Sequence, residues 1–283
     1  MSVYDFFYAI WRMVRNVGLI VRNEPAPSRL PMLLTYAWLQ FRFLVVVTLL
    51  KRRIDEEHLF GFTVKFFNYG MFLFLFEEIF IWKPYDFKAA TDCPVIIDCG
   101  SNIGMSILYF KRLYPNCIIV GFEPDKVTFE LLKENVSRNR LQHVTLFNRA
   151  VSDATGTIDF YSDPDLPGSL AMTARPERGL EARAQVETTP LSDHLGGEID
   201  FLKMDIEGSE ECVLEDLTRQ NKLKLVKEMV FEYHHHERPE KDTLAGVLAT
   251  LERNGFGYEI SALTLAPFQR GRFHGMLIYA YRK

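Results

Sequence analysis

The sequence is poor in several features that each point to a class of protein. Its 283 residues include only four cysteines, none in C-x-x-C spacing, so we expect buried, reduced thiols in a cytoplasmic protein. The formal net charge of −4 gives no basic surface of the kind that binds nucleic acid. The N-terminus lacks the continuous apolar core and the cleavage site of a secretory signal. The apolar fraction of 48% is ample for a large core.

The first sixty residues also lack a convincing membrane span. Residues 3–22 are typical of an amphipathic basic helix that ends near the prolines at 25 and 27, and residues 30–53 are typical of a second helix. The apolar run at 43–50 is about half the roughly 20 residues that a bilayer needs. Two interpretations stay open. The helices form a packing layer, lid or dimer contact, or they lie on an anionic membrane surface through basic side chains, namely Arg12, Arg15, Lys51, Arg52 and Arg53.

The glycine-rich stretch 95–104 and the segment 118–124 have the pattern of a strand, a helix and a second strand. The first apolar run ends in Asp98, and Gly100 and Gly104 let the backbone pass close to a ligand because they carry no Cβ. Glu123 follows the second apolar run, where an acidic side chain accepts hydrogen bonds from ribose hydroxyls. The pattern predicts half of a nucleotide-binding fold.

The middle glycine of the dinucleotide fingerprint is missing from this turn. Asn102 stands there, in the order D-x-G-x-N-x-G. An asparagine narrows the turn and suits a zwitterionic ligand better than a pyrophosphate. S-adenosylmethionine fits this description because it has a ribose, an adenine and an amino-acid tail but no phosphate. The predicted cofactor is therefore S-adenosylmethionine, bound by Asp98, Gly100, Asn102, Gly104 and Glu123.

The chain resembles the FkbM family of S-adenosylmethionine-dependent O-methyltransferases from about residue 60 to the C-terminus. The most family-specific stretch is K203-M-D-I-E-G208. The other matching segments are 97–104, 122–124, 148–153 with Gly156, 200–210 and 231–234. The resemblance implies an α/β fold: a doubly wound, mostly parallel seven-stranded Rossmann-like sheet with an antiparallel last strand, after an N-terminal helical extension. We expect the extension at 1–60 and the methyltransferase domain at 61–283.

Further site residues are expected where other strands end, because ligands of doubly wound sheets lie beyond the carboxyl ends of the strands. A strand over 144–151 places Asn148 and Ala150 beside the adenine, although Asn148 is equally typical of a turn-capping amide. A strand over 199–205 delivers Asp205 and Glu207. These two acids are predicted to hold the cofactor or to orient the acceptor hydroxyl, although a cation site and a helix N-cap fit them too.

The last candidates lie on the strand expected over 229–236. Methyl transfer to an alcohol is helped by a general base, and Glu232 and His234 are of the right type. Three consecutive histidines also suggest a metal site, but neighbouring residues of a strand point to opposite faces, so they cannot easily share one ion. We predict Asp205, Glu232 and His234 as catalytic residues and no metal.

The sequence as a whole predicts a cytoplasmic O-methyltransferase, with the N-terminal helices as its one candidate contact with a membrane. The expected acceptor is a hydroxyl of a sugar, glycan or other small metabolite. A nucleotide-dependent oxidoreductase is disfavoured by the missing glycine. A non-catalytic binding or scaffold protein on the same fold is disfavoured by the intact set of acids, namely Asp98, Glu123, Asp205 and Glu232. The sequence does not indicate the oligomeric state.

Overall fold

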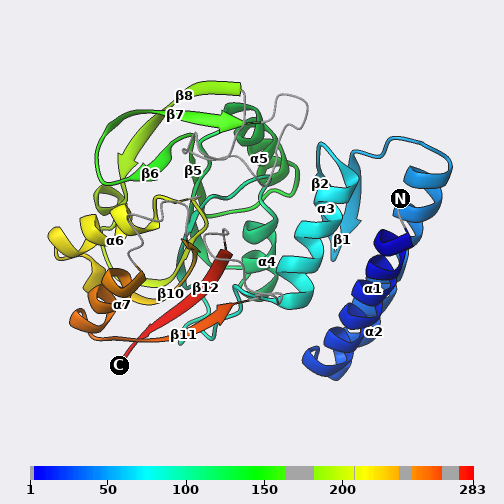
Figure 1. The fold of residues 1–283 in the computed structure, drawn as a ribbon, viewed down its shortest axis with the longest axis horizontal. Helices are drawn as coiled ribbons and strands as arrows, with labels where there is room; N and C mark the ends of the chain where they lie inside the picture. Colours follow the sequence, from blue (N-terminus) through cyan, green and yellow to red (C-terminus); the bar gives the residue numbers. More distant parts are fainter. Residues whose placement is uncertain (1–2, 163–181, 207, 236–243, 263–273) are drawn as a thin grey trace. The chain divides into compact units, whose positions relative to one another are not determined.

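The chain folds into two compact units, Met1–Asp86 and Phe87–Lys283, and each is described by itself. The computed structural model describes residues 3–162, 182–206, 208–235, 244–262 and 274–283 (Figure 1). Compactness does not test which residues a methyltransferase domain needs. The domain boundary expected at residue 60 therefore stays a prediction.

The first unit combines helices with one small hairpin. Its helices are α1 (Val3–Asn23), α2 (Ala26–Phe41) and α3 (Tyr69–Phe76), and α2 and α3 continue as π-helical segments, η1 (Arg42–Leu49) and η2 (Glu77–Trp82). The hairpin pairs β1 (Glu56–Leu59) with β2 (Phe62–Lys65). The two predicted N-terminal helices are confirmed. The sequence analysis did not predict β1.

Local residue choices explain where these elements turn. Phe60 and Gly61 both have positive φ, 52° and 89°, as a two-residue turn between twisted antiparallel strands requires. Asn68 caps α3, because its side chain accepts a hydrogen bond from the Met71 amide at 3.1 Å. Lys83 adopts the left-handed conformation that ends η2.

A fully buried carboxylate, Glu77 on η2, holds α1 and α2 against the rest of the first unit. The Tyr36 hydroxyl and the Gln40 amide of α2 donate to Glu77 Oε1 at 3.0 and 2.8 Å. Arg12 Nε of α1 lies 3.1 Å from Glu77 Oε2. Burial raises the pKa of Glu77, and the Arg12 charge opposes that rise. The contacts satisfy a charge that would otherwise be costly to bury.

Two further buried acids repeat this arrangement. Glu57 of β1 accepts from the Tyr69 hydroxyl of α3 at 3.0 Å and pairs with Arg42 Nε of η1 at 2.7 Å. Glu24, between α1 and α2, lies 2.6 Å from Lys83 Nζ. Polar contacts therefore fix the inward side of the helix pair at three places.

The second unit is built on a seven-stranded sheet in the order β11-β12-β10-β9-β3-β4-β5 (Figure 1). All neighbours are parallel except β12, which runs antiparallel to both β10 and β11. This confirms the predicted fold class. The strands are β3 (Val95–Cys99), β4 (Ile118–Phe122), β5 (Val144–Phe147), β9 (Ile199–Met204), β10 (Val226–His235), β11 (Phe256–Ala262) and β12 (His274–Arg282).

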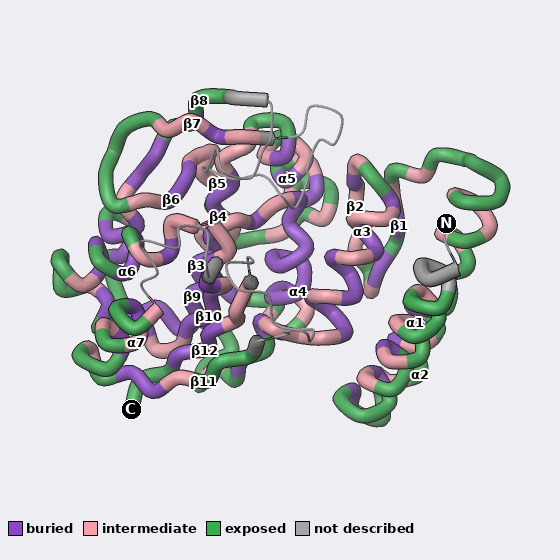
Figure 2. Tube along the Cα trace, in the orientation of Figure 1, coloured by how far each residue is buried: buried purple, intermediate pink, exposed green. Residues whose placement is uncertain are grey.

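Helices follow β3, β4, β9 and β10, as the crossover connections of parallel strands require. They are α4 (Met105–Leu113), α5 (Lys126–Arg138), α6 (Glu210–Arg219) and α7 (Leu244–Arg253). The central strand β9 is buried at all six positions, and Figure 2 shows the sheet as the buried centre of the unit. Strands buried on both faces read as continuous apolar runs, so the two charged residues of β9, Asp200 and Lys203, need partners inside the protein.

The strand predicted over 144–151 is wrong in its second half. β5 ends at Phe147, and Ala150 begins β6 (Ala150–Ser152), which pairs in parallel with β8 (Ala182–Pro190) in a separate three-stranded sheet with β7 (Gly156–Ser162). Asn148 explains the break. Its amide nitrogen donates to the carbonyls of Glu123 and Pro124, both at 2.9 Å, so the chain turns there.

The expectation that the cysteines are buried, reduced thiols is confirmed only in part. All four are free thiols. Cys99 and Cys117 are buried, whereas Cys93 and Cys212 are exposed, so the prediction of buried thiols is wrong for these two. Burial raises the pKa of the Cys99 and Cys117 thiols, which keeps them protonated and unreactive.

We predict that Glu77→Ala lowers the free energy of unfolding of the first unit by about 3–5 kcal/mol, because it leaves Arg12 and two buried donors without their acceptor. Chemical denaturation followed by tryptophan fluorescence measures this. Asp55→Ala, at an exposed acid of the same unit, is the control and should cost less than about 0.5 kcal/mol. Equal effects of the two changes would contradict the role given to Glu77.

Candidate active site

The turn between β3 and α4 is held against the end of β4. The amides of Gly100 and Ser101 both donate to the Phe122 carbonyl at 2.9 Å, and the Gly104 amide donates to the Ser101 carbonyl at 2.9 Å. Asn102 has a φ of +48°, a left-handed conformation that asparagine adopts more readily than most residues. This accounts for an asparagine where a dinucleotide-binding turn has glycine.

Gly100 is required by a close approach of two backbone segments. A Cβ built on Gly100 would lie 2.0 Å from the carbonyl oxygen of Asp205, and the φ of Gly100 is +81°. The Asp205 amide also donates to the Cys99 carbonyl at 3.1 Å. The glycine turn and the end of β9 are therefore packed backbone to backbone, which brings Asp205 beside the turn.

Glu123 lies just beyond β4 and is tied to the same turn. Its Oε2 accepts from the Asn102 amide and its Oε1 from the Asp125 amide, each at 2.9 Å. The residue is only 4% exposed. Burial raises the pKa of Glu123 to about 8, against the opposing effect of the two amides. Each carboxylate oxygen has a second lone pair, so both can still accept a hydrogen bond from a ligand hydroxyl.

Lys203 is a buried cation that the sequence analysis did not single out. It is 2% exposed, and its Nζ donates to the Gly100 carbonyl at 2.6 Å and to the Cys99 carbonyl at 3.3 Å. The same Nζ lies 3.3 Å from Asp98 Oδ1 and 3.9 Å from Asp205 Oδ2. Burial alone lowers the pKa of Lys203, but the two carboxylates outweigh it and raise the pKa above its usual value.

Asp98 faces the protein interior. It is fully buried, its Oδ2 accepts from the Ser106 hydroxyl of α4 at 2.5 Å, and its Oδ1 faces Lys203. Asp98 and Lys203 are register partners on neighbouring parallel strands. The predicted cofactor residue Asp98 therefore braces the glycine turn through Lys203 and Ser106. A lysine among apolar neighbours in the motif K-M-D was the sequence signal for this brace.

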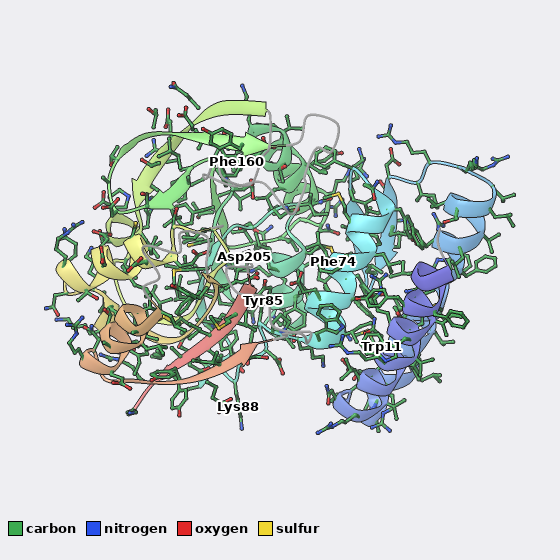
Figure 3. All side chains as sticks on the ribbon, in the orientation of Figure 1. Trp11, Phe74, Tyr85, Lys88, Phe160 and Asp205 are labelled. Atoms are coloured by element: carbon green, nitrogen blue, oxygen red, sulfur yellow. The ribbon has the colours of Figure 1, made fainter. Side chains whose placement is uncertain are left out.

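The strand registers place the predicted acids on one face of the sheet. Registered residues of parallel strands point to the same face, and side chains alternate along each strand. Asp98 pairs with Lys203 and Met204 pairs with Phe231, so Asp205 and Glu232 continue the Lys203 face side by side. Figure 3 labels Asp205 where β9 ends. Its side chain is 35% exposed, which leaves it accessible to a ligand.

The remaining predicted residues are described in part. The Glu232 side chain lies over Gly275 of β12. A Cβ built on Gly275 would lie 2.0 Å from Glu232 Oε1. The backbone of His234 is paired with Gly275 in the β10–β12 register. The His234 side chain and Glu207 lie outside the described residues. Ala150 packs with Phe160 and Val186 in a small apolar cluster, so the structure does not bring it to the glycine turn.

Asn148 uses its amide nitrogen as a turn cap, by the two bonds to the Glu123 and Pro124 carbonyls given above. The capping alternative is thus what the structure shows. Glu210, the first residue of α6, accepts from the Ile206 and Gly208 amides at 3.2 and 2.9 Å. In the described part of the chain, no group of three or more His, Cys, Asp or Glu could hold a metal ion.

Residues 98–258 match the family model described as the methyltransferase FkbM domain, which is more than half of the chain. The chain belongs to the FkbM methyltransferase family. The match starts at Asp98 and includes the glycine turn, Glu123, Lys203, Asp205 and Glu232, which confirms the resemblance derived from the sequence. The protein is therefore a methyltransferase.

Curated relatives agree with this assignment. The methyltransferase sdnD of Sordaria araneosa is 31% identical over 230 residues, covering 69% of this chain and 86% of that protein. The 31-O-demethyl-FK506 methyltransferase FkbM of Streptomyces tacrolimicus is 28% identical over 229 residues, with the same coverage of 69% and 86%. The 2-O-methyltransferase NoeI of Sinorhizobium fredii is 33% identical over 141 residues, which cover 43% of this chain and 56% of that protein.

We predict that Lys203→Met lowers the free energy of unfolding of the second unit by about 3–5 kcal/mol, because it leaves Asp98 as a buried charge without its cation. The double variant Asp98→Asn/Lys203→Met should recover part of this loss, since it removes both charges. Lys224→Met, at an exposed lysine, is the control. Denaturant titration of the unchanged chain, of Asp98→Asn, of Lys203→Met and of the double variant measures the coupling. Additive effects of the two single changes would contradict the brace.

Proposed function

We propose that this chain transfers a methyl group from S-adenosylmethionine to a hydroxyl of a sugar or other small metabolite. The names of two relatives, a 31-O-demethyl-FK506 methyltransferase and a 2-O-methyltransferase, support oxygen as the acceptor atom. They differ in acceptor, so the proposal extends to the class of small hydroxylated molecules. The proposed compartment is the cytoplasm, in keeping with four free cysteines.

The observation that carries the proposal is the buried carboxylate of Glu123 beside the glycine turn. Its two oxygens are fixed by the Asn102 and Asp125 amides and keep a free lone pair each. A pair of neighbouring ribose hydroxyls matches two such acceptors. The residues present therefore fit S-adenosylmethionine, whose sulfonium supplies an electrophilic methyl group when it is bound.

The other predicted cofactor residues take roles that follow from their positions. The turn at the ribose is proposed to be shaped by Gly100, Asn102 and Gly104. Asp98 supports that turn through its contacts with Lys203 and Ser106. Asp205 and Glu207 follow β9, where a carboxylate can hold the ammonium group of the amino-acid tail. Asn148 and Ala150 are proposed to act at the adenine. Asn148 is proposed to act by fixing the backbone of Glu123 and Pro124. Ala150 is proposed to act through its backbone, which follows Asn148 at the start of β6.

The acceptor hydroxyl is proposed to lie between Asp205 and Glu232 on the same face of the sheet. Transfer forms an oxygen–carbon bond as the carbon–sulfur bond breaks, and the hydroxyl proton must leave. Glu232, or His234 two residues further along the chain, takes that proton as general base. Asp205 borders both the cofactor and the acceptor, so it orients the hydroxyl for in-line attack.

We predict that Glu123→Ala weakens binding of S-adenosylhomocysteine at least about tenfold, because each hydrogen bond to a carboxylate contributes roughly 1.5–3 kcal/mol. Isothermal titration calorimetry measures the affinity, and Glu130→Ala, at an exposed acid on α5, is the control. Tight binding of NAD without a response to S-adenosylhomocysteine would overturn the proposed cofactor.

The raised pKa of Glu123 predicts how this binding depends on pH. A pKa of about 8 in the free protein means that Glu123 carries a proton at pH 7. Hydroxyl donors favour the charged carboxylate, so binding should release a proton and tighten as the pH rises toward 8, then level off. Calorimetry in buffers of different ionisation enthalpy counts the released protons. The Glu123→Gln variant should show neither the release nor the slope.

We predict that Glu232→Gln or His234→Ala lowers kcat at least about tenfold with cofactor affinity nearly unchanged, as expected for loss of a general base. Asp205→Asn should be more severe and should also weaken cofactor binding. An acceptor found by screening with radiolabelled cofactor provides the assay. Glu198→Gln, at an exposed acid before β9, is the control. Full turnover by both strand variants at saturating acceptor would mean that positioning alone drives transfer.

A further inference from the structure

The outer side of α1 is a stripe of exposed apolar residues. Ile10, Val14, Val17 and Val21 follow one another at three- or four-residue spacing, and Trp11 lies three residues before Val14. The exposed fractions of all five lie between 42% and 67%. Residues at this spacing share one face of a helix. The buried positions on the opposite side of α1 include a polar residue, Asn16, which is fully buried.

The helix formed by α2 and η1 has the same distribution. Leu30, Leu34, Trp38, Phe41 and Leu44 are 46–62% exposed. The inward side of this helix carries Tyr36 and Gln40, which reach Glu77. In both helices polar anchors are buried together with the apolar residues Ile20, Met32 and Leu39, and a second set of apolar residues is exposed. A helix on the surface of a protein that meets only water carries polar residues on its outer face instead.

The two exposed faces belong to one surface. Arg12 of α1 and the pair Tyr36 and Gln40 of α2 all converge on Glu77, so the opposite sides of both helices point away from the same residue. The helices pack against each other in the first unit, and Figure 2 shows exposed positions along both. Together they present a contiguous apolar surface, larger than isolated surface hydrophobics explain.

Charge is concentrated beside this surface. Residues 1–53 contain eight Arg and Lys but only two Asp and Glu, in a chain with a formal net charge of −4. Lys51, Arg52 and Arg53 are exposed directly after the apolar helix. Arg15 lies over the Trp11 ring at 5.5 Å and Arg42 over the Trp38 ring at 5.7 Å. Tryptophans flanked by basic residues are typical of the boundary between lipid headgroups and acyl chains.

We propose that the exposed face of α1 and α2–η1 lies in the surface of an anionic lipid bilayer, parallel to the membrane. The stretch Ala26–Leu49 is long and apolar enough to cross a membrane by length and composition. Spanning would, however, pull Tyr36 and Gln40 away from Glu77 and leave a buried carboxylate without its donors. A second copy is a poorer occupant because it would bring a second set of basic residues against the first.

Sedimentation of the full chain with vesicles tests this proposal. Binding is expected to vesicles containing phosphatidylglycerol at low salt, with much less binding to pure phosphatidylcholine vesicles and to anionic vesicles at high salt. Val14→Asp/Leu34→Asp should lower the partition coefficient at least tenfold. Val127→Asp, at an equally exposed apolar residue of α5 (55% exposed, against 67% and 62%), should not. Lys51→Gln/Arg52→Gln/Arg53→Gln should remove most of the preference for anionic lipid.

Three results would overturn the proposal. One is equal binding by the Val14→Asp/Leu34→Asp variant and the unchanged chain. Another is resistance of the bound protein to alkaline carbonate extraction, which would indicate a spanning helix. The third is a dimer in light scattering that the Val14→Asp/Leu34→Asp variant abolishes, with no vesicle binding, which would assign the surface to a second copy. Circular dichroism of each variant establishes that loss of binding is not loss of fold.

Discussion

The ion pair between Asp98 and Lys203 is the constraint on which the site depends. The lysine amine sits between neighbouring strands of the sheet, where water does not reach it, and its charge is tolerated only because carboxylates and backbone carbonyls surround it. The bond to the Gly100 carbonyl ties the glycine turn to β9, and the close backbone approach at Gly100 brings Asp205 to the same place. The glycine turn and Asp205 are thus positioned by one buried cation.

The fold was predictable where apolar residues recur along the chain at the regular spacing of a strand or a helix. The residues of β3, α4 and β4 follow the expected order of a strand, a helix and a second strand. The prediction was wrong at 144–151, because an apolar run does not reveal that Asn148 turns its amide back onto the Glu123 and Pro124 carbonyls. The strand β1 was missed for a related reason. Its sequence E-E-H-L is polar, and its pairing with β2 depends on a two-residue turn at Phe60 and Gly61.

The site was predictable to the extent that its chemistry lies in local motifs. The turn glycines and Glu123 stand at fixed spacing, so the sequence indicates them directly. The sequence pattern alone does not reveal the role of Lys203, because that role depends on Asp98. The two residues are more than a hundred positions apart in the chain and become neighbours only through the register of β3 and β9. The same limit applies to Asn148, for which two local roles were equally consistent with the sequence until the bonds to the turn were known.

The three acids around the glycine turn differ most in burial, and burial separates their roles. Asp98 has no exposed surface, and its carboxylate pairs with Lys203, so its role is structural. Glu123 is nearly as buried, and its two oxygens accept hydrogen bonds from backbone amides. Burial raises its pKa because a carboxylate away from water is poorly solvated. Asp205, with a side chain 35% exposed, keeps contact with solvent. Neighbouring carboxylates at one edge of the sheet therefore differ in solvation. Asp98 braces the glycine turn, whereas the roles proposed for Glu123 at the cofactor and for Asp205 at the acceptor need a carboxylate that a ligand can reach.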